Sequence, residues 1–122
     1  MEVRKSTEDY LEAILMLREK LGYARSVDIA EHLGITKPSV TYYTKRMKEE
    51  GYVYTDHANM LYLTEEGNQI ASKVYNRHRV LTDFFIALGV DPEIARKDAC
   101  MVEHDLSPET FDALYRHAKE IN

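Results

Sequence analysis

The sequence predicts a mainly α-helical chain that contains one small β-hairpin. Apolar residues recur at helical spacing over most of the 122 residues, which predicts several amphipathic helices. Two short segments of alternating apolar and polar residues flank one polar turn near the middle, which predicts the hairpin. With 44% hydrophobic and 30% charged residues, the composition is that of an ordinary globular chain.

Charge is distributed unevenly along the chain, although its net value is only −5. Residues 36–50 carry four basic and two acidic side chains, whereas residues 91–122 carry four basic and eight acidic ones. This contrast predicts two parts with different partners. Cys100 is the only cysteine, so no intrachain disulfide can form and a cytoplasmic location is expected. No membrane contact is expected either, because no apolar run reaches the ~18 residues that a spanning helix needs.

The first predicted helix begins at Ser6 or Thr7, whose hydroxyl can cap it, and ends at Gly22. Asp9 and Glu12 lie three residues apart and therefore share one face of this helix. Taken alone, neither residue indicates a metal site. Asp9 is favoured in the first turn by the positive end of the helix dipole, and Glu12 is expected to be solvated. The apolar stripe of the helix consists of Tyr10, Ala13, Ile14, Leu17 and Leu21.

Residues 24–47 have the pattern of a helix-turn-helix. A short helix with an apolar face is followed by Gly34, which can adopt the positive φ of a tight turn. Thr36 can cap a second helix, and Pro38 fits the first turn of that helix because its missing N–H costs nothing there. The inward residues of the two helices are Ile29, Ala30, Leu33, Val40, Tyr43 or Thr44, and Met47.

The outward face of the second helix predicts a DNA-reading surface. Its longest side chains are basic or aromatic and can reach phosphates or base edges in a major groove. An amphipathic helix that is merely solvated is the alternative, but the glycine turn and the acid-free, Thr/Ser-rich helix start favour DNA binding. The candidate DNA-binding residues are Thr36, Lys37, Pro38, Ser39, Thr41, Tyr42, Lys45 and Arg46.

Segments 52–55 and 60–63 predict the two strands of the hairpin, with a polar turn at residues 56–59. A hairpin directly after a reading helix is the wing of a winged helix-turn-helix. Its tip can lie against the DNA backbone, although Asp56 has the wrong sign for a strong phosphate contact. Thr64 can then cap a long helix over about residues 65–88. Two predicted domains share this helix. Residues 1–72 form the DNA-binding domain, and residues 73–122 form a helical domain.

Two shorter helices follow, one from Pro92 to about His104 and one that restarts at residues 106–109. The large apolar side chains of this region are too many for one small unit to enclose. They predict a helical dimer interface rather than an exposed patch. The candidate interface residues are Phe84, Phe85, Leu88, Phe111, Leu114 and Tyr115.

Cys100, Glu103 and His104 form the clearest chemical cluster in the sequence. Positions i, i+3 and i+4 share one helix face, so a thiol, a carboxylate and an imidazole converge there. These three groups bind transition metals, but a structural zinc site usually uses more cysteines. The cluster therefore needs ligands from elsewhere in the chain. A lone histidine on a helix, such as His78, is by itself more often solvated or hydrogen-bonded than a ligand.

With these parts in place, the chain resembles the diphtheria toxin repressor family of metal-dependent transcription regulators, and it is most similar to the manganese transport regulator branch. The resemblance implies a winged helix-turn-helix followed by a helical dimerisation domain, without the SH3-like domain of the longer branch. It runs over essentially the whole chain and rests on residues 7–12, 22–25, 28–30, 38–41, 63–64, 77–78 and 102–104.

The resemblance also implies a set of metal ligands: Asp9, Glu12, His78, Cys100, Glu103 and His104. It thereby reverses the local interpretation of Asp9, Glu12 and His78. Cys100 stands where manganese-type members have a glutamate, whereas Asp9 stands where iron-type members have a methionine. Two ancillary ligands of iron-type members are replaced by Thr82 and Arg96. The predicted site is a hybrid of the two branches.

The resulting hypothesis is a primary ion held by Asp9, Cys100, Glu103 and His104. A second ion, with Glu12 and His78 as ligands and Glu103 as a bridge, is left open. The resemblance implies Fe²⁺ or Mn²⁺ as corepressor. The thiolate of Cys100 shifts the metal preference of the site from Mn²⁺ towards Fe²⁺, Co²⁺ or Zn²⁺. Co²⁺ or Zn²⁺ can therefore occupy the site in vitro.

The predicted function is that of a metal-dependent repressor that controls metal homeostasis and binds a palindromic DNA operator as a homodimer. One alternative is a metal-independent winged-helix regulator that senses a small ligand. Another is a small metalloenzyme, although the sequence has no nucleophile motif and no glycine-rich phosphate loop.

Overall fold

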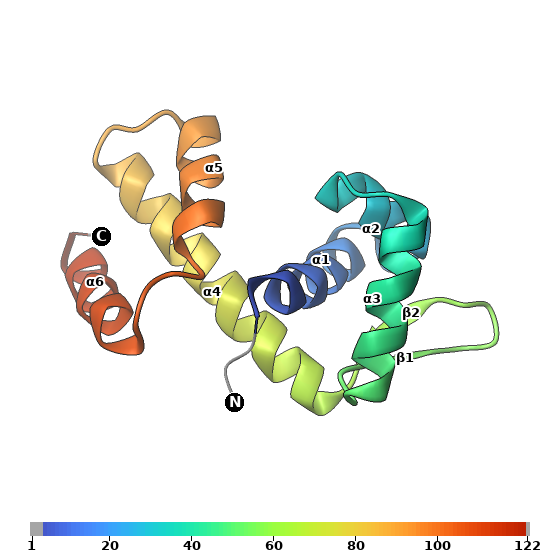
Figure 1. The fold of residues 1–122 in the computed structure, drawn as a ribbon. Coiled ribbons are helices and arrows are strands. Elements are labelled where there is room, and N and C mark those ends of the chain that lie inside the picture. Colours follow the sequence, from blue (N-terminus) through green and yellow to red (C-terminus); the bar gives the residue numbers. More distant parts are fainter. Residues whose placement is uncertain (1–3, 122) are drawn as a thin grey trace. The chain divides into compact units, whose positions relative to one another are not determined.

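The computed structural model describes residues 4–121, which form six helices and one two-stranded antiparallel sheet (Figure 1). The chain divides into two compact units, residues 1–72 and 73–122, and α4 contributes to both. This confirms the predicted fold class. The elements are α1 (Lys5–Leu21), α2 (Ser26–Leu33), α3 (Lys37–Glu49), β1 (Val53–Thr55), β2 (Leu61–Leu63), α4 (Glu65–Ala87), α5 (Pro92–Val102) and α6 (Pro108–Ile121).

The first unit contains the predicted helix-turn-helix, formed by α2 and α3 and supported by α1. Gly34 ends α2 with φ 68°, in the left-handed region, and its N–H donates to the Ala30 carbonyl. The Thr36 hydroxyl oxygen caps α3 by accepting from the Ser39 N–H at 3.2 Å. The buried core of this unit consists of Tyr10, Leu11, Ile14, Leu17, Ala24, Ile29, Val40, Met47, Val53, Leu61 and Ala71.

The wing is a short hairpin whose turn is organised by Asp56. Strands β1 and β2 pair with Val53 opposite Leu63. One carboxylate oxygen of Asp56 accepts from the N–H groups of Ala58 and Met60, at 2.9 and 3.0 Å, and the other accepts from the Tyr62 hydroxyl at 2.9 Å. The bond from the Met60 N–H is the main reason why the pKa of Asp56 lies below its usual value. The charge of Asp56 therefore stabilises the turn itself.

The start of α4 lies directly against the residue that precedes β1. The Thr64 N–H donates to the Tyr52 carbonyl at 3.0 Å, and the Thr64 hydroxyl donates to the Gly51 carbonyl at 2.6 Å. Gly67 is buried, and a Cβ added there would overlap the backbone carbonyl of Tyr52. Only glycine allows this close approach between helix and wing.

The second unit consists of the later part of α4 together with α5 and α6. Asp91 caps α5 by accepting from the Glu93 N–H at 3.1 Å, and Ser107 caps α6 by accepting from the Thr110 N–H at 3.1 Å. The buried apolar residues of this unit are Val74, Leu81, Ala95, Ala99, Phe111 and Ala118. Among residues 4–121, no helix combines the length and the apolarity that crossing a membrane requires.

The boundaries of three helices differ from the sequence-based expectation. Helix α1 begins at Lys5 with Arg4 at the cap position and no side-chain cap, so neither Ser6 nor Thr7 caps it. Thr7 instead lies on the buried side of the helix, one turn before Tyr10. Helix α4 ends at Ala87, one residue early. Helix α5 ends at Val102 rather than near His104.

Candidate metal centre and nucleic-acid interface

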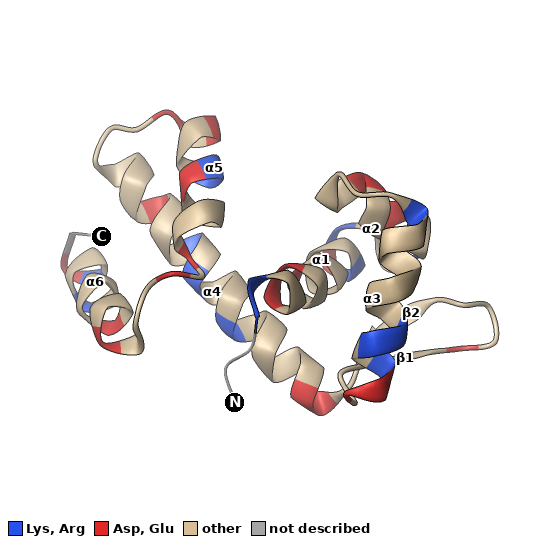
Figure 2. Cartoon of the chain, in the orientation of Figure 1, with Lys and Arg blue, Asp and Glu red and all other residues tan. Residues whose placement is uncertain are grey.

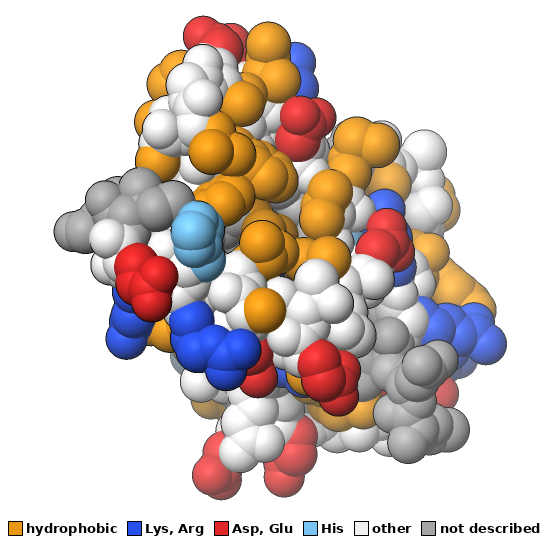
Figure 3. Space-filling model, turned by 90° about the vertical axis from the view of Figure 1, so that its left-hand side faces the viewer, with side chains coloured by type: hydrophobic (Ala, Val, Ile, Leu, Met, Phe, Trp, Pro, Cys, Tyr) orange, Lys and Arg blue, Asp and Glu red, His pale blue; other side chains and the backbone are white. Residues whose placement is uncertain are grey.

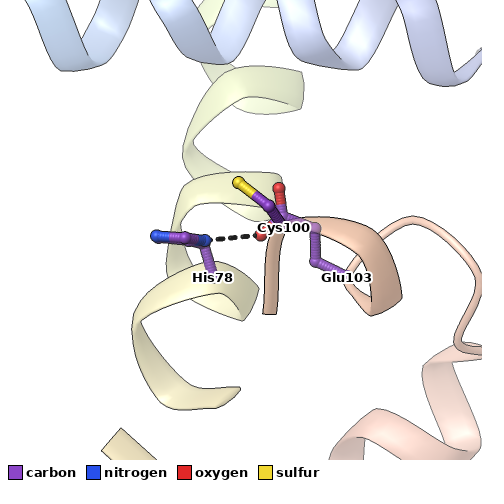
Figure 4. A group of neighbouring side chains, drawn as sticks. All are labelled: His78, Cys100 and Glu103. Atoms are coloured by element: carbon purple, nitrogen blue, oxygen red, sulfur yellow. Dashed lines mark hydrogen bonds and ion pairs between the residues drawn. The ribbon is translucent and has the colours of Figure 1, made fainter. Parts of the chain in front are cut away.

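Three potential metal ligands converge in the second unit. His78 lies on α4, Cys100 lies on α5, and Glu103 follows the last residue of α5 (Figure 4). One ligand atom from each of these side chains lies within 4.8 Å of the other two. His78 Nδ1 lies 2.9 Å from Glu103 Oε2.

Local backbone structure explains why Cys100 and Glu103 stay together although α5 ends between them. Glu103 keeps helical angles, φ −57° and ψ −27°, and its N–H donates to the Ala99 carbonyl. The spacing i, i+3 therefore still places both side chains on one face. Ala99 is fully buried beside them, so this part of α5 is fixed inside the unit, while Cys100 itself is exposed.

Glu103 is the buried carboxylate at the centre of the cluster, with 1% of its surface exposed. Its Oε2 faces His78, and its Oε1 lies 3.3 Å from Nε2 of His104. A carboxylate buried at this depth is costly unless it is paired. The imidazole of His78 provides that pairing through a hydrogen bond to Oε2, whereas Oε1, although close to His104, accepts no hydrogen bond from the residues that the structure describes.

The protonation of His78 is shifted by its neighbours. The Cys100 sulfur and, next in importance, the Glu103 carboxylate raise the pKa of His78 to about 10, against the opposing effect of burial. Without a metal ion, His78 therefore carries a proton at neutral pH. Deprotonated, the cluster offers one sulfur, one nitrogen and one oxygen donor, a set that fits a divalent transition ion.

The other predicted ligands are placed as follows. His104 follows Glu103 in the turn after α5 and pairs with it. Asp9 and Glu12 lie on α1 in the first unit, three residues apart on one helix face, with Asp9 half-buried and Glu12 buried. The structure thus brings His78, Cys100 and Glu103 together within one unit.

Sequence reasoning gave no role to Arg77, which precedes His78 on α4. Arg77 is 8% exposed. Its Nη1 donates to the backbone carbonyl of Glu103 at 3.2 Å and to that of Leu106 at 2.8 Å. Its signals in the sequence are its position next to a candidate ligand and its place in segment 77–78, which contributes to the family resemblance.

Helix α3 and its cap residue Thr36 carry the predicted DNA-binding residues, with basic positions near both ends of the helix and acidic positions at its C-terminal end (Figure 2). Its hydroxyl side chains serve local structure: Thr36 and Ser39 form the cap, and Thr41 donates to the Lys37 carbonyl at 3.1 Å. The longer side chains extend outward; Tyr42 is 57% exposed. Lys37, Pro38 and Lys45 are exposed, and Arg46 is half-buried.

Arg46 is held by two neighbours one helical turn away on either side. Its Nη1 lies 3.5 Å from the Tyr42 hydroxyl, and its Nη2 lies 3.5 Å from the Glu50 carboxylate. These are long contacts at the surface, so they contribute little to stability and can exchange for a phosphate.

Hydrophobic side chains gather on the face that carries the second unit (Figure 3). Of the predicted interface residues, Leu88 is 63% exposed, while Phe84, Phe85, Leu114 and Tyr115 are half-buried. Phe111 is buried inside its own unit. Ile86, Ile94 and Met101 are exposed large apolar residues of the second unit that sequence reasoning did not single out.

Fold and cluster together define a winged helix-turn-helix protein with a metal-binding helical unit. Comparison with known families gives the same division. The profile described as "Iron dependent repressor, N-terminal DNA binding domain" matches residues 2–61. The profile described as "Iron dependent repressor, metal binding and dimerisation domain" matches residues 64–122.

Individual relatives agree. The transcriptional regulator MntR of Salmonella typhimurium is 40% identical over 110 residues, which cover 90% of this chain and 70% of that protein. The HTH-type transcriptional regulator MntR of Bacillus subtilis is 38% identical over 109 residues, covering 89% and 77%. Among solved structures, the manganese regulator SloR superposes with a TM-score of 0.79 at 28% identity, covering 98% of this chain and 55% of SloR. The chain thus spans about half the length of that structure.

The chain therefore belongs to the iron-dependent repressor family of metal-dependent transcriptional regulators. This membership confirms the predicted resemblance and the predicted class of function, a metal-dependent DNA-binding regulator. It also speaks against the two alternatives, since the family is neither metal-independent nor enzymatic. DNA binding and homodimerisation are supported at the level of the two matched domains.

Proposed function

We propose that this chain represses metal-homeostasis genes when Fe²⁺ or Mn²⁺ occupies a centre built on His78, Cys100 and Glu103. The convergence of these three ligand atoms within 4.8 Å carries the proposal. The matched domain profiles are named for iron, and SloR is named a manganese regulator, which supports these two ions. Co²⁺ and Zn²⁺ also suit the donor set, because a thiolate is softer than the oxygen donors that Mn²⁺ prefers.

The proposed ligand set is larger than this cluster. His104 is included because it pairs with Glu103, and Asp9 and Glu12 are included because the sequence resemblance implies ligands at these positions. The resemblance divides these residues between a primary ion at Asp9, Cys100, Glu103 and His104 and a second ion at Glu12, His78 and a bridging Glu103. The structure instead groups His78 with Cys100 and Glu103, so the proposed centre takes His78 as a ligand together with Cys100.

A bound divalent ion supplies the positive charge that holds anionic and imidazole ligands at one point. Asp9 and Glu12 lie on the helix before the DNA-reading helix, whereas the other ligands belong to the second unit. Ligation by both units would restrict the spacing of the two reading heads in a dimer, so DNA binding loses less entropy. Metal and DNA must then strengthen each other's binding by the same factor, typically ~1–3 kcal/mol.

The proposed DNA target is a palindromic operator, because two copies of a helix-turn-helix in a homodimer read two-fold-related half-sites. The reading residues are those of α3, and the dimer is formed by the apolar residues of the second unit. The proposed location is the cytoplasm, because the chain is similar to transcriptional regulators of bacteria such as Salmonella typhimurium.

The test is metal-dependent retention of a palindromic duplex at a fixed salt concentration. Salt must be fixed because the phosphate contacts are strongly salt-dependent. Mn²⁺, Fe²⁺ and Zn²⁺ are titrated with and without a chelator. Wild-type protein is expected to retain the duplex more strongly with metal, by the ~5–150-fold that such coupling allows.

Asp9→Ala tests the mechanism, and Glu8→Ala on the same helix is its control. Asp9→Ala is expected to lose the metal-stimulated part of DNA binding while its sedimentation behaviour stays that of the wild type. Glu8→Ala is expected to respond to metal normally. If metal still increased the DNA binding of Asp9→Ala, the proposed mechanism would be contradicted.

A further inference from the structure

Arg77 is a buried cation that contacts the turn carrying two of the proposed ligands. Its Nη1 donates to the carbonyl oxygens of Glu103 and Leu106, at 3.2 and 2.8 Å. Its guanidinium carbon lies 5.2 Å from the centre of the Phe111 ring. One side chain of α4 thus connects the turn after α5 with α6, all within the second unit.

Arg77 and His78 hold Glu103 at two different points. His78 lies against the side-chain oxygen Oε2, whereas Arg77 binds the main-chain oxygen of the same residue. Neighbouring residues on a helix point about 100° apart, so these two contacts reach Glu103 from different directions. With its carbonyl fixed, Glu103 cannot shift its carboxylate by moving the backbone of the turn.

An arginine suits this position for a physical reason. The carbonyls of residues that follow a helix lack N–H partners inside the helix, and buried ones need a donor from elsewhere. A guanidinium is planar and permanently charged, so it can donate to two carbonyls and stack on Phe111 at the same time. Its positive charge is also favourable beside the C-terminal end of α5.

We propose that Arg77 is a positioning residue of the metal centre, which fixes the turn of Glu103 and His104 so that the ligands are in place before an ion arrives. This inference rests on the proposed metal function. Groups that orient metal ligands from outside typically change metal affinity ~10–100-fold when they are removed. A purely structural arginine would instead lower the stability of the metal-free protein and leave the affinity of the folded protein unchanged.

The experiment is a Co²⁺ titration followed by the thiolate-to-cobalt absorption that Cys100 would produce. Arg77→Lys keeps the charge but loses the planar fork, and Arg77→Met loses both. Arg79→Met is the matched control, because Arg79 is exposed on the same helix and its guanidinium carbon lies 5.5 Å from the ring centre of Tyr75. Thermal melts of each metal-free and Co²⁺-loaded variant are recorded in parallel.

Arg77→Met is expected to bind Co²⁺ up to ~100-fold more weakly, with an altered band, and Arg77→Lys about 10-fold more weakly. Arg79→Met should match the wild type. A wild-type band and affinity in both Arg77 variants would overturn this proposal alone, whatever their melting temperatures. If Arg77→Met does not fold, Arg77→Lys decides by the same criterion. A wild-type protein without any thiolate band would overturn the metal function and this proposal with it.

Discussion

Replacing His78 with glutamine should remove about one proton from the number released when Co²⁺ binds near pH 7.5. The reason is the pKa of His78, which the Cys100 sulfur and the Glu103 carboxylate raise to about 10. A metal ion binds the neutral imidazole, so an ion that uses His78 must displace this proton.

The expected difference is large enough to measure. A histidine with the ordinary pKa of about 6.5 is only about one-tenth protonated near pH 7.5 and would release about 0.1 proton. With a pKa of about 10, His78 is almost fully protonated and releases about 1. The assay pH lies about 2.5 pH units below the pKa of His78, so displacing its proton lowers the apparent affinity on the order of 100-fold relative to high pH, or about 3 kcal/mol.

The assay is calorimetry in buffers of different ionisation enthalpy, which counts the protons released per ion. His117→Gln is the control, because His117 is exposed on α6 and outside the proposed ligand set. An NMR titration of the metal-free protein measures the midpoint of His78 directly. A midpoint near 6.5, or a proton count that is the same in His78→Gln and the wild type, would refute the reasoning.

The same shift makes the stability of the metal-free protein pH-dependent. Because the folded pKa of His78 is raised, its interactions with the Cys100 sulfur and the Glu103 carboxylate contribute fully below about pH 6.5 and are lost as the pH rises through about 10. Urea unfolding of the wild type should therefore give a lower free energy of unfolding at the upper end of this range. The decline should be smaller in His78→Gln, and an equal decline would assign it to other groups.

Three further outcomes are expected. Gly67→Ala should lower the free energy of unfolding in urea by ~1–3 kcal/mol, because the added Cβ would overlap the Tyr52 carbonyl. Ser72→Ala, at an exposed position of the same helix, should leave this free energy unchanged. Equal values for the two variants would show that α4 does not pack tightly against Tyr52. Cys100→Glu should raise the Mn²⁺ response of DNA binding relative to Fe²⁺, and an unchanged ranking would remove Cys100 from metal selectivity. Arg46→Ala should weaken binding to all duplexes and lower the salt slope by about 1; a loss confined to one sequence would indicate base recognition instead.

The parts of the fold that follow from local signals could be predicted from the sequence. The turn at Gly34, the cap at Thr36 and the hairpin each depend on a few consecutive residues, and the structure contains all three. The start of α1 was wrong because Thr7 is a good cap in isolation but is buried by the tertiary structure. Burial of one residue by distant elements leaves no trace in the neighbouring sequence.

The metal cluster was predictable only in part for the same reason. Cys100 and Glu103 are linked by helical spacing, but His78 is 25 residues from Glu103, and only the family resemblance indicated it. Arg77 was missed because its partners are backbone carbonyls, 26 and 29 residues away, and every residue has a carbonyl. A side chain that contacts a backbone atom places no requirement on the side chain of its partner residue. The sequence therefore shows no pair of complementary residues that would predict the contact.

In the metal-free cluster, a proton on the imidazole of His78 occupies the nitrogen that an ion would bind. The imidazolium of His78 neutralises Glu103 and keeps the carboxylate buried, so the ligands need not separate when no metal is present. This arrangement reduces the reorganisation needed for binding, but the proton must leave first. Proton and ion therefore compete for the same acceptors, and the metal concentration at which such a centre fills must rise as the pH falls. Arg77 binds the backbone of Glu103 and not its carboxylate, so ligation of an ion by the carboxylate does not require this contact to break.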